Sequence, residues 1–312
     1  MIRLSELSER YLQHQSAFRS EGHIQNLREQ LRRVIASIGD RPIDEVRPPL
    51  LHEHVARRRT ERRPVWRPAP SNRTLNMETG ALRHALGWAV KMEMIAVNPL
   101  QAWQPLPYRR WEWRKDRRAM SGAEREALLA AVGRMDQKRV VPQLPMYRTF
   151  LEAGLRWNEV ATLQWRDIDW DARAIQIRAE VEKSRRGRMV PISKELVTVL
   201  RALQETQRSK VGIPTNLVFL SPTGRRLSRD SCVALRTLYR TLDLAGIRRK
   251  NGSGSIDIHA LRDDAATQLA IRGVPLTATA KFLGHADPRV TAKHYIKHQL
   301  ADLRKSIFPD DP

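Results

Sequence analysis

Six residues in the second half of the chain are of types suited to chemistry on a phosphate group. They are Arg156, Lys183, His259, Arg262, His285 and Tyr295. Four short segments carry them, and these read EAGLRWNEVATLQWRDID, EVEKSRRGRMVPI, IHALRDDAATQLA and FLGHADPRVTAKHYIK. Guanidinium groups form fixed, charge-assisted hydrogen bonds with phosphate oxygens, and a tyrosine hydroxyl is an oxygen nucleophile. His259 and Arg262 are three residues apart, which places them on one side of a helical turn.

The charge of the chain indicates a polyanionic partner. The 312 residues include 56 Lys and Arg but only 34 Asp and Glu, which gives a net charge of +22. Residues 1–120 hold 23 basic and 13 acidic side chains, and residues 121–312 hold 33 and 21, so the surplus is not confined to a tail. Such a surplus favours nucleic acid or an anionic membrane surface as the partner, contacted by both halves.

Other features of the composition exclude several classes of protein. The single cysteine, Cys232, allows neither an internal disulfide nor a cysteine-based zinc site, which suits a reducing cytoplasm. No apolar run approaches the ~20 residues of a membrane span. The N-terminal sequence MIRLSELSER has charges where a signal peptide would be apolar. We therefore predict a soluble, cytoplasmic protein with no membrane segment and no metal-ligand cluster.

The elements that must position the six residues differ between the two halves. Apolar spacing over residues 1–104 predicts four helices and no strand. The second helix ends at Gly39, residues 41–49 form a proline-rich turn region, and the third helix covers residues 50–59. Ser71 or Asn72 caps the fourth helix, whose apolar face includes Met92.

Residues 105–118 are predicted to form a basic linker between two domains. Pro105 and Pro107 disfavour a helix, and basic residues alternate with aromatic ones. Such a segment could lie along a phosphate backbone, or its aromatic side chains could pack on a domain surface. The arginines that we expect to contact DNA, here and in two other basic stretches, are Arg62, Arg63, Arg73, Arg109, Arg110, Arg185 and Arg186.

Residues 119–312 are predicted to form a mixed domain. Ser121 and Glu124 have the spacing of a capping box at the start of a helix, and helices are expected over 121–133, 142–153 and 193–208. Alternating residues 173–182 and 186–193 indicate two strands on either side of a charged turn, and 217–221 a short third strand. The fold class is therefore α+β, mainly helical, with a small β-sheet.

The four segments, in this order, resemble the tyrosine recombinases, also called phage integrases. HxLR or LGH alone turns up by chance in many proteins, but here all four segments are present and Tyr295 lies ten residues beyond LGH. The resemblance covers essentially the whole chain. It implies a helical SAM-like core-binding domain over 1–104 and a catalytic domain over 119–312 with a C-terminal tail that docks on a neighbouring subunit.

The resemblance also implies a role for each of the six residues. Tyr295 matches the nucleophile, which stores the broken bond as a phosphotyrosyl ester. Arg156 and Arg262 match the guanidiniums that stabilise a phosphorane-like state, and His285 would donate a hydrogen bond to the phosphate. His259 matches the base, and Lys183 matches the group that protonates the departing 5′-oxygen. The family reaction uses no metal and no other cofactor.

Each of these residues, taken alone, could also have a role that is not catalytic. Arg156 could be a solvated surface arginine, and His259 could have a purely structural role. His285 could cap a loop, and Tyr295 could be a half-buried packing residue. Arg185, Arg186 and Arg188 could make the whole turn around Lys183 a simple phosphate-contacting patch. Asp263 and Asp264 depart from the family pattern, and we expect both to point away from the pocket, favoured by the dipole at the start of their helix.

The sequence thus predicts a site-specific recombinase of double-stranded DNA, acting as a homo-tetramer on two sites. The chain is expected to begin at the core-binding domain, which favours an integrase of a mobile genetic element or, alternatively, an Xer-type enzyme that resolves chromosome or plasmid dimers. The same scaffold could also serve a non-catalytic DNA-binding protein or a type IB topoisomerase. Accessory proteins, the target sequence and whether the tail docks in cis or in trans are left open.

Overall fold

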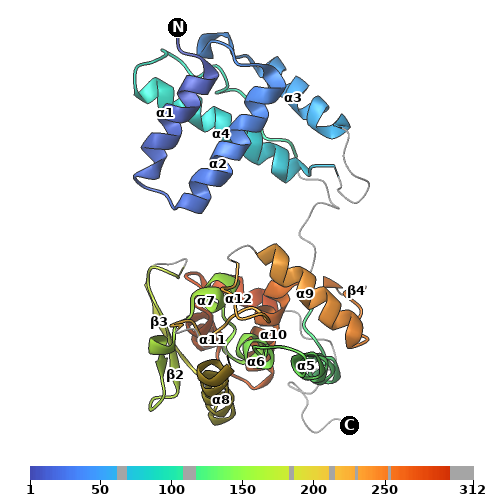
Figure 1. Ribbon diagram of the computed structural model, residues 1–312. Helices are drawn as coiled ribbons and strands as arrows, with labels where there is room; N and C mark the ends of the chain where they lie inside the picture. The colour runs from blue at the N-terminus through green and yellow to red at the C-terminus, as the bar shows by residue number, and fades with distance from the viewer. Residues whose placement is uncertain are drawn as a thin grey trace. The chain divides into compact units, whose positions relative to one another are not determined.

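The computed structural model describes residues 1–61, 69–107, 117–182, 186–210, 215–228, 231–251 and 254–295, without the side chains of residues 210, 231 and 293–295. The chain divides into two compact units, Met1–Arg114 and Lys115–Pro312 (Figure 1). Each unit has its own hydrophobic core. Most of the predicted linker, residues 108–116, lies outside the described residues.

Unit 1 is built from helices. They are α1 (Leu4–Ser16), α2 (Glu21–Ile38), α3 (Pro48–Thr60) and α4 (Asn72–Lys91), with a 3-10 turn at Ile43–Glu45. The predicted end of α2 and the predicted start of α4 are both present. Gly39 follows α2 with φ +85°, a backbone conformation that glycine adopts without strain, and the Ser71 hydroxyl accepts a hydrogen bond from the backbone N–H of Thr74 at 3.2 Å.

Two expectations for unit 1 are wrong in detail. Pro48 and Pro49 do not stand before the third helix but form its first turn, where the missing proline N–H would have no helical partner in any case. Met92 does not lie on the apolar face of α4. The helix ends at Lys91, and the Met92 side chain is 46% exposed.

A buried ionic cluster joins α3 to α4 in unit 1. The Glu78 carboxylate accepts hydrogen bonds from Arg58 at 2.9 and 3.0 Å and lies 3.1 Å from His54 Nε2. Arg58 also pairs with Glu61, and Arg33 of α2 lies 3.6 Å from Glu78. Burial alone would raise the pKa of Glu78, but the hydrogen bonds from His54 and Arg58 outweigh it and lower this pKa to about 2.

Unit 2 combines helices with a small three-stranded antiparallel sheet, which lies at one edge of the unit (Figure 1). Its first helices are α5 (Gly122–Asp136), α6 (Leu144–Ala153) and α7 (Trp157–Thr162). The sheet has the order β1 (Ile168–Asp169), β2 (Ala174–Ile177), β3 (Arg188–Pro191), with Ile175 paired to Val190. The remaining elements are α8 (Lys194–Lys210), α9 (Ser231–Leu244), β4 (Lys250–Asn251), β5 (Gly254–Ser255), α10 (Ile258–Ile271), α11 (Leu276–Leu283) and α12 (Pro288–Tyr295). The predicted α+β class, mainly helical, is confirmed.

The strand expected at 217–221 is absent from the described residues. Leu217 and Leu220 form only isolated bridges, to Gln164 and Arg226. The apolar run that suggested a strand is instead explained by burial, because Val218 and Phe219 belong to the core. The strand predicted within 173–182 is also shorter, since β2 ends at Ile177 and residues 179–181 lie in a turn.

Helix α10 is central to the arrangement of the functional residues. It packs against α6, α11 and α12 (Figure 1). The capping box predicted for α5 is present, with Ser121 and Glu124 each accepting from the other's backbone N–H. Among the described residues, no helix has both the length and the apolar character that crossing a bilayer requires.

Candidate active site

Arg156 is held at the junction between α6 and α7. Helix α6 ends at Gly154 in the left-handed conformation, with φ +60°, and an added Cβ there would lie 2.8 Å from the Leu283 side chain. Two residues later, Arg156 caps α7, and its Nη1 donates to Glu159 Oε1 at 2.9 Å. Its Nη2 donates to the Gly284 carbonyl at 2.9 Å. The side chain remains 22% exposed, so the guanidinium is fixed on one side and accessible on the other.

Arg262 approaches the same loop from α10. It is 5% exposed, and its guanidinium donates to the carbonyls of Gly154 and Leu283. Burial, the larger cause, and the like charge of Arg156 together lower the pKa of Arg262 to about 9. At this pKa the guanidinium is charged at neutral pH. The two predicted phosphate-binding guanidiniums therefore bind consecutive carbonyls, those of Leu283 and Gly284.

His285 connects Arg262 to α12. Its Nε2 lies 3.1 Å from Arg262 Nη2, and its Nδ1 lies 2.8 Å from Thr291 Oγ1. A guanidinium has no acceptor, so Nε2 must accept, and the ring proton of a neutral His285 is on Nδ1. In this arrangement Nε2 is not a donor, and the predicted bond from His285 to a phosphate requires either a doubly protonated ring or an Nε2 released from Arg262.

Tyr295 is placed by its backbone alone. It is the last residue of α12, the helix that also contains Thr291. Thr291 is fully buried, and its bond to His285 ties the start of α12 to the loop that receives the two arginines. The Tyr295 side chain lies outside the described residues.

Two residues that the sequence reasoning did not select complete the cluster. Glu159, with 1% of its side chain exposed, accepts from Arg156 and from both Nη atoms of Arg188. Burial would raise the pKa of Glu159, but the hydrogen bonds and charge of Arg188 hold it below its ordinary value. The sequence gives no capping-box signal for Glu159, because the Arg156 guanidinium cannot accept a hydrogen bond and only Glu159 accepts, from the Arg156 backbone N–H.

The second of these residues, Arg188, corrects an expectation. The alternative interpretation of the turn around Lys183 as a phosphate-contacting patch includes Arg188, but its side chain is only 7% exposed and is paired with Glu159 and Glu182. Gly284 borders this pair with φ +66°. A Cβ at Gly284 would lie 2.8 Å from Arg188 Nη1 and would clash with Glu182, so only glycine fits.

His259 lies one turn before Arg262 on α10 and is exposed at the surface. Partial desolvation by its neighbours, followed by the positive charge of Arg117, lowers the pKa of His259 below its ordinary value. This shift favours the neutral ring, the form that can act as a general base. Asp257 caps α10 and pairs with Arg117 at 2.9 Å, which fixes that charge close to the imidazole.

The two acidic residues after Arg262 are held by specific partners, so the helix dipole is not the main reason for their placement. Asp264 is fully buried, pairs with Arg125 at 2.7 Å and accepts from the backbone N–H of Met120 at 3.2 Å. Asp263 lies 3.8 Å from Arg117. Asp264 thus anchors the start of α5 to α10.

The remaining predicted site residues are placed only in part. Lys183 and five of the expected DNA-contacting arginines lie outside the described residues, namely Arg62, Arg63, Arg109, Arg110 and Arg185. Arg73 and Arg186 are exposed, as a contact with DNA requires. Across the described ranges, no group of three or more His, Cys, Asp or Glu side chains is arranged to hold a metal ion.

Comparison with known proteins identifies the family of the chain. A model of the phage integrase family matches residues 118–301, more than half of the chain. An XerC tyrosine recombinase of Pseudomonas aeruginosa is 32% identical over 166 residues, which are 47% of this chain and 37% of that protein. The tyrosine recombinase XerC of Chlamydia trachomatis serovar L2 is 27% identical over 251 residues, 77% of this chain and 71% of the relative.

A solved structure shows the same fold over nearly the full length. The Tn1549 transposon integrase, in complex with transposon right end DNA, superposes with a TM-score of 0.72 at 19% identity, covering 99% of both chains. The chain belongs to the phage integrase family. The resemblance proposed from its motifs is thereby confirmed.

Proposed function

We propose that the protein is a site-specific tyrosine recombinase that cleaves and rejoins duplex DNA through a 3′-phosphotyrosyl intermediate. One observation carries this proposal. Arg156 and Arg262 bind adjacent carbonyls beside His285, and the same loop is bonded to the helix that ends in Tyr295. Two fixed cations, connected through His285 and Thr291 to the helix that carries a tyrosine, suit phosphoryl transfer to a tyrosine hydroxyl.

The proposed cleavage step is balanced without a cofactor. The Tyr295 hydroxyl attacks the scissile phosphorus, His259 accepts its proton, and the bond from phosphorus to the 5′-oxygen breaks. Lys183 protonates that oxygen, while Arg156 and Arg262 meet the charge that develops on the non-bridging oxygens. A 5′-hydroxyl from a partner duplex then attacks the phosphotyrosyl ester in the reverse sense, so the bond energy is conserved.

A nicked suicide substrate tests the proposal. The short strand released after cleavage diffuses away, so the covalent adduct accumulates and is seen as a protein–DNA band on a denaturing gel. We expect an adduct with wild type and none with Tyr295→Phe. Tyr11→Phe, which removes a hydroxyl in the core of unit 1, is the matched control and should cleave like wild type.

The suicide substrate, together with a separate assay on a supercoiled plasmid, distinguishes the recombinase from two different functions. Specific binding of the correct site without an adduct would instead identify a non-catalytic DNA-binding protein. Relaxation of supercoils without strand exchange would identify a topoisomerase. The presence of all six predicted catalytic residue types favours an enzyme over a non-catalytic DNA-binding protein. The compact helical unit 1 favours a recombinase over a topoisomerase, which would use the same chemistry.

The partners that we propose are double-stranded recombination sites and further copies of the chain, four subunits on two sites. Leu300, Leu303 and Ile307 have helical spacing in the C-terminal tail and would dock on a neighbouring subunit. Deletion of residues 299–312 should leave binding of a single site intact and reduce cooperative assembly, measured by gel shift. Unchanged cooperativity would contradict trans docking.

For the biological role we favour an integrase of a mobile genetic element over an Xer-type resolving enzyme. Relatives of both kinds support the general reaction, since they include XerC recombinases and a transposon integrase. Mapping the bound sequence in the source genome distinguishes the two. Sites that flank a mobile element support the integrase, and a site near the replication terminus supports dimer resolution.

A further inference from the structure

Arg188 occupies an unusual position beside the predicted phosphate pocket. It stands at the start of β3 and donates to Glu159 at 2.9 and 3.0 Å, to Glu182 at 2.7 Å and to the Phe282 carbonyl at 3.0 Å. These partners come from α7, from the turn after β2 and from the segment that leads to Gly284. The side chain is nearly completely buried, so it is not placed to bind DNA itself.

Glu159 connects Arg188 to the phosphate-binding arginine. Its carboxylate accepts from Arg156 Nη1 at 2.9 Å and from the Arg156 backbone N–H at 2.9 Å, and it accepts from Arg188 at the same time. A buried carboxylate needs a counter-charge. If Arg188 were absent, Arg156 would have to neutralise Glu159, and less of its positive charge would be available to a phosphate.

We propose that Arg188 is a positioning residue that neutralises Glu159 and ties β3 to the last residues of α11, next to Gly284, so that the charge of Arg156 is kept for the scissile phosphate. This inference rests on the proposed function, because it assigns a phosphate to Arg156. Arg188 acts through Glu159 and the Phe282 carbonyl without touching the DNA. The pocket then depends on a residue that never meets the substrate.

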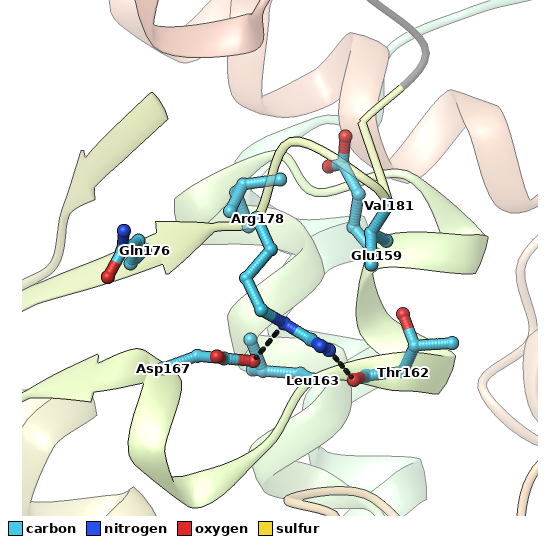
Figure 2. Close-up of a pocket in the computed structure, with 8 residues that line it drawn as sticks. Glu159, Thr162, Leu163, Asp167, Gln176, Arg178 and Val181 are labelled. Atoms are coloured by element: carbon cyan, nitrogen blue, oxygen red, sulfur yellow. Dashed lines mark hydrogen bonds and ion pairs between the residues drawn. The ribbon is translucent and has the colours of Figure 1, made fainter. Parts of the chain in front are cut away.

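The chain offers a matched control in Arg178, which follows β2 on the other side of the same hairpin. Figure 2 shows its guanidinium directed at Asp167, at 3.2 Å, and at the Thr162 carbonyl, at 2.9 Å. Arg178 is also mostly buried and ion-paired, and Glu159 lines the same small pocket. The groups that its guanidinium contacts, however, include neither Arg156 nor residues 282–285.

The test compares two suicide substrates. One carries an ordinary scissile phosphate, and the other a methylphosphonate, in which a methyl group replaces one non-bridging oxygen and removes its negative charge. We expect Arg188→Gln to lower the rate of adduct formation about 100-fold on the phosphate, because a small displacement of Arg156 suffices for that loss. The rate on the methylphosphonate should fall much less, since it needs less charge stabilisation. Arg178→Gln should change both rates by the same factor, within about twofold.

The variant Arg188→Lys separates a loss of positioning from a loss of folding. It keeps the positive charge but cannot bridge two carboxylates and a carbonyl as the planar guanidinium does, so its rate on the phosphate should lie between those of wild type and Arg188→Gln. An equal loss on both substrates in the Arg188 variants would show that Arg188 is merely structural and would overturn the proposal.

A second measurement does not depend on cleavage. Inorganic phosphate that binds the folded pocket raises the Tm, compared with sodium chloride at equal ionic strength. This rise should be much smaller in Arg188→Gln and unchanged in Arg178→Gln. If wild type forms no adduct but the Tm result holds, the recombinase function fails and the role of Arg188 stands. If wild type forms the adduct and the Arg188 and Arg178 variants show the same Tm rise, the role of Arg188 fails alone.

Discussion

Two buried clusters, one in each unit, use the same residue types with different results. In unit 1, Glu78 is surrounded by His54, Arg58 and Arg33, and Arg58 also pairs with Glu61. In unit 2, Glu159 is shared by Arg156 and Arg188, and Arg188 also pairs with Glu182. Arg262 lies close by and donates to the Leu283 carbonyl, next to the Gly284 carbonyl that Arg156 binds. Both clusters hold a carboxylate that is almost completely buried.

The difference lies in the charge that remains. In the unit 1 cluster Arg32, Arg33 and Arg58 match Glu29, Glu61 and Glu78, and the network joins α2, α3 and α4. In the unit 2 cluster three arginines face two glutamates, and Arg156 retains 22% of its surface. A balanced buried network mainly stabilises the fold, whereas an unbalanced one attracts an anion. The comparison predicts that substitutions in unit 1 reduce stability and that substitutions in unit 2 reduce catalysis.

The largest effect is expected from Arg262→Gln. Loss of one fixed cation should lower the rate of adduct formation by about 10²–10³-fold, because the charge that develops on the phosphate loses a preorganised donor. The unfolding free energy should fall by only about 1–3 kcal/mol, the cost of leaving buried carbonyls without a donor. Suicide-substrate kinetics and urea unfolding measure the two quantities. Arg272→Gln, on the exposed end of the same helix, should change neither.

Glu78→Gln should show the opposite behaviour. It leaves Arg58 and Arg33 without their shared carboxylate, and we expect unit 1 to lose about 3–5 kcal/mol of unfolding free energy. Cleavage per folded molecule should stay at the wild-type rate. Glu29→Gln is the control, because Glu29 pairs with Arg32 and Arg33 on the exposed face of α2 and should cost at most about 1 kcal/mol.

The low pKa of Glu78 adds a pH dependence to this test. Its folded value of about 2 lies below the ordinary glutamate value, so its contribution is complete above pH ~4.5 and is lost as the pH falls towards 2. Wild-type unfolding free energy should therefore drop more steeply in this window than that of Glu78→Gln. Equal slopes would contradict the assigned role of Glu78.

Thr291→Val should have a smaller effect and one confined to unit 2. The variant keeps the shape but removes the acceptor for the His285 Nδ1 proton, so the tautomer that accepts from Arg262 is no longer favoured. We expect about a tenfold loss in the rate of adduct formation. Thr291→Ser restores the hydroxyl and should recover most of that rate. If Thr291→Ser and Thr291→Val are equally impaired, packing and not the hydrogen bond is the cause.

The smallest effect is a shift in the pH profile on substitution of Arg117. Partial desolvation by neighbouring groups and the charge of Arg117 both disfavour the imidazolium form of His259 and lower its pKa. Arg117→Gln removes only the second cause, so the pKa should rise and the acid limb of the cleavage rate should move to higher pH by less than about one unit. Rates between pH 5 and 8 measure the shift. An unmoved acid limb would show that His259 is not the base.

The helices of unit 1 could be predicted because their apolar spacing and their stops are local. Gly39 ends α2 through its own backbone, and Ser71 caps α4 through an N–H three residues away. The strand expected at 217–221 was wrong for the complementary reason. Val218 and Phe219 are apolar because the core covers them, and a run of buried residues does not reveal whether a strand partner exists.

For the site, the sequence by itself determined the residue types, their order and the family to which the chain belongs. The tertiary structure alone decided that Arg188 is a buried partner of Glu159 and not a DNA contact, and that Arg156 meets a carbonyl 128 residues further along the chain. Capping and helical periodicity depend on neighbours within one turn, so they can be read from the chain. Burial, the tautomer of His285 and the counter-charge of each arginine depend on residues that only folding brings together.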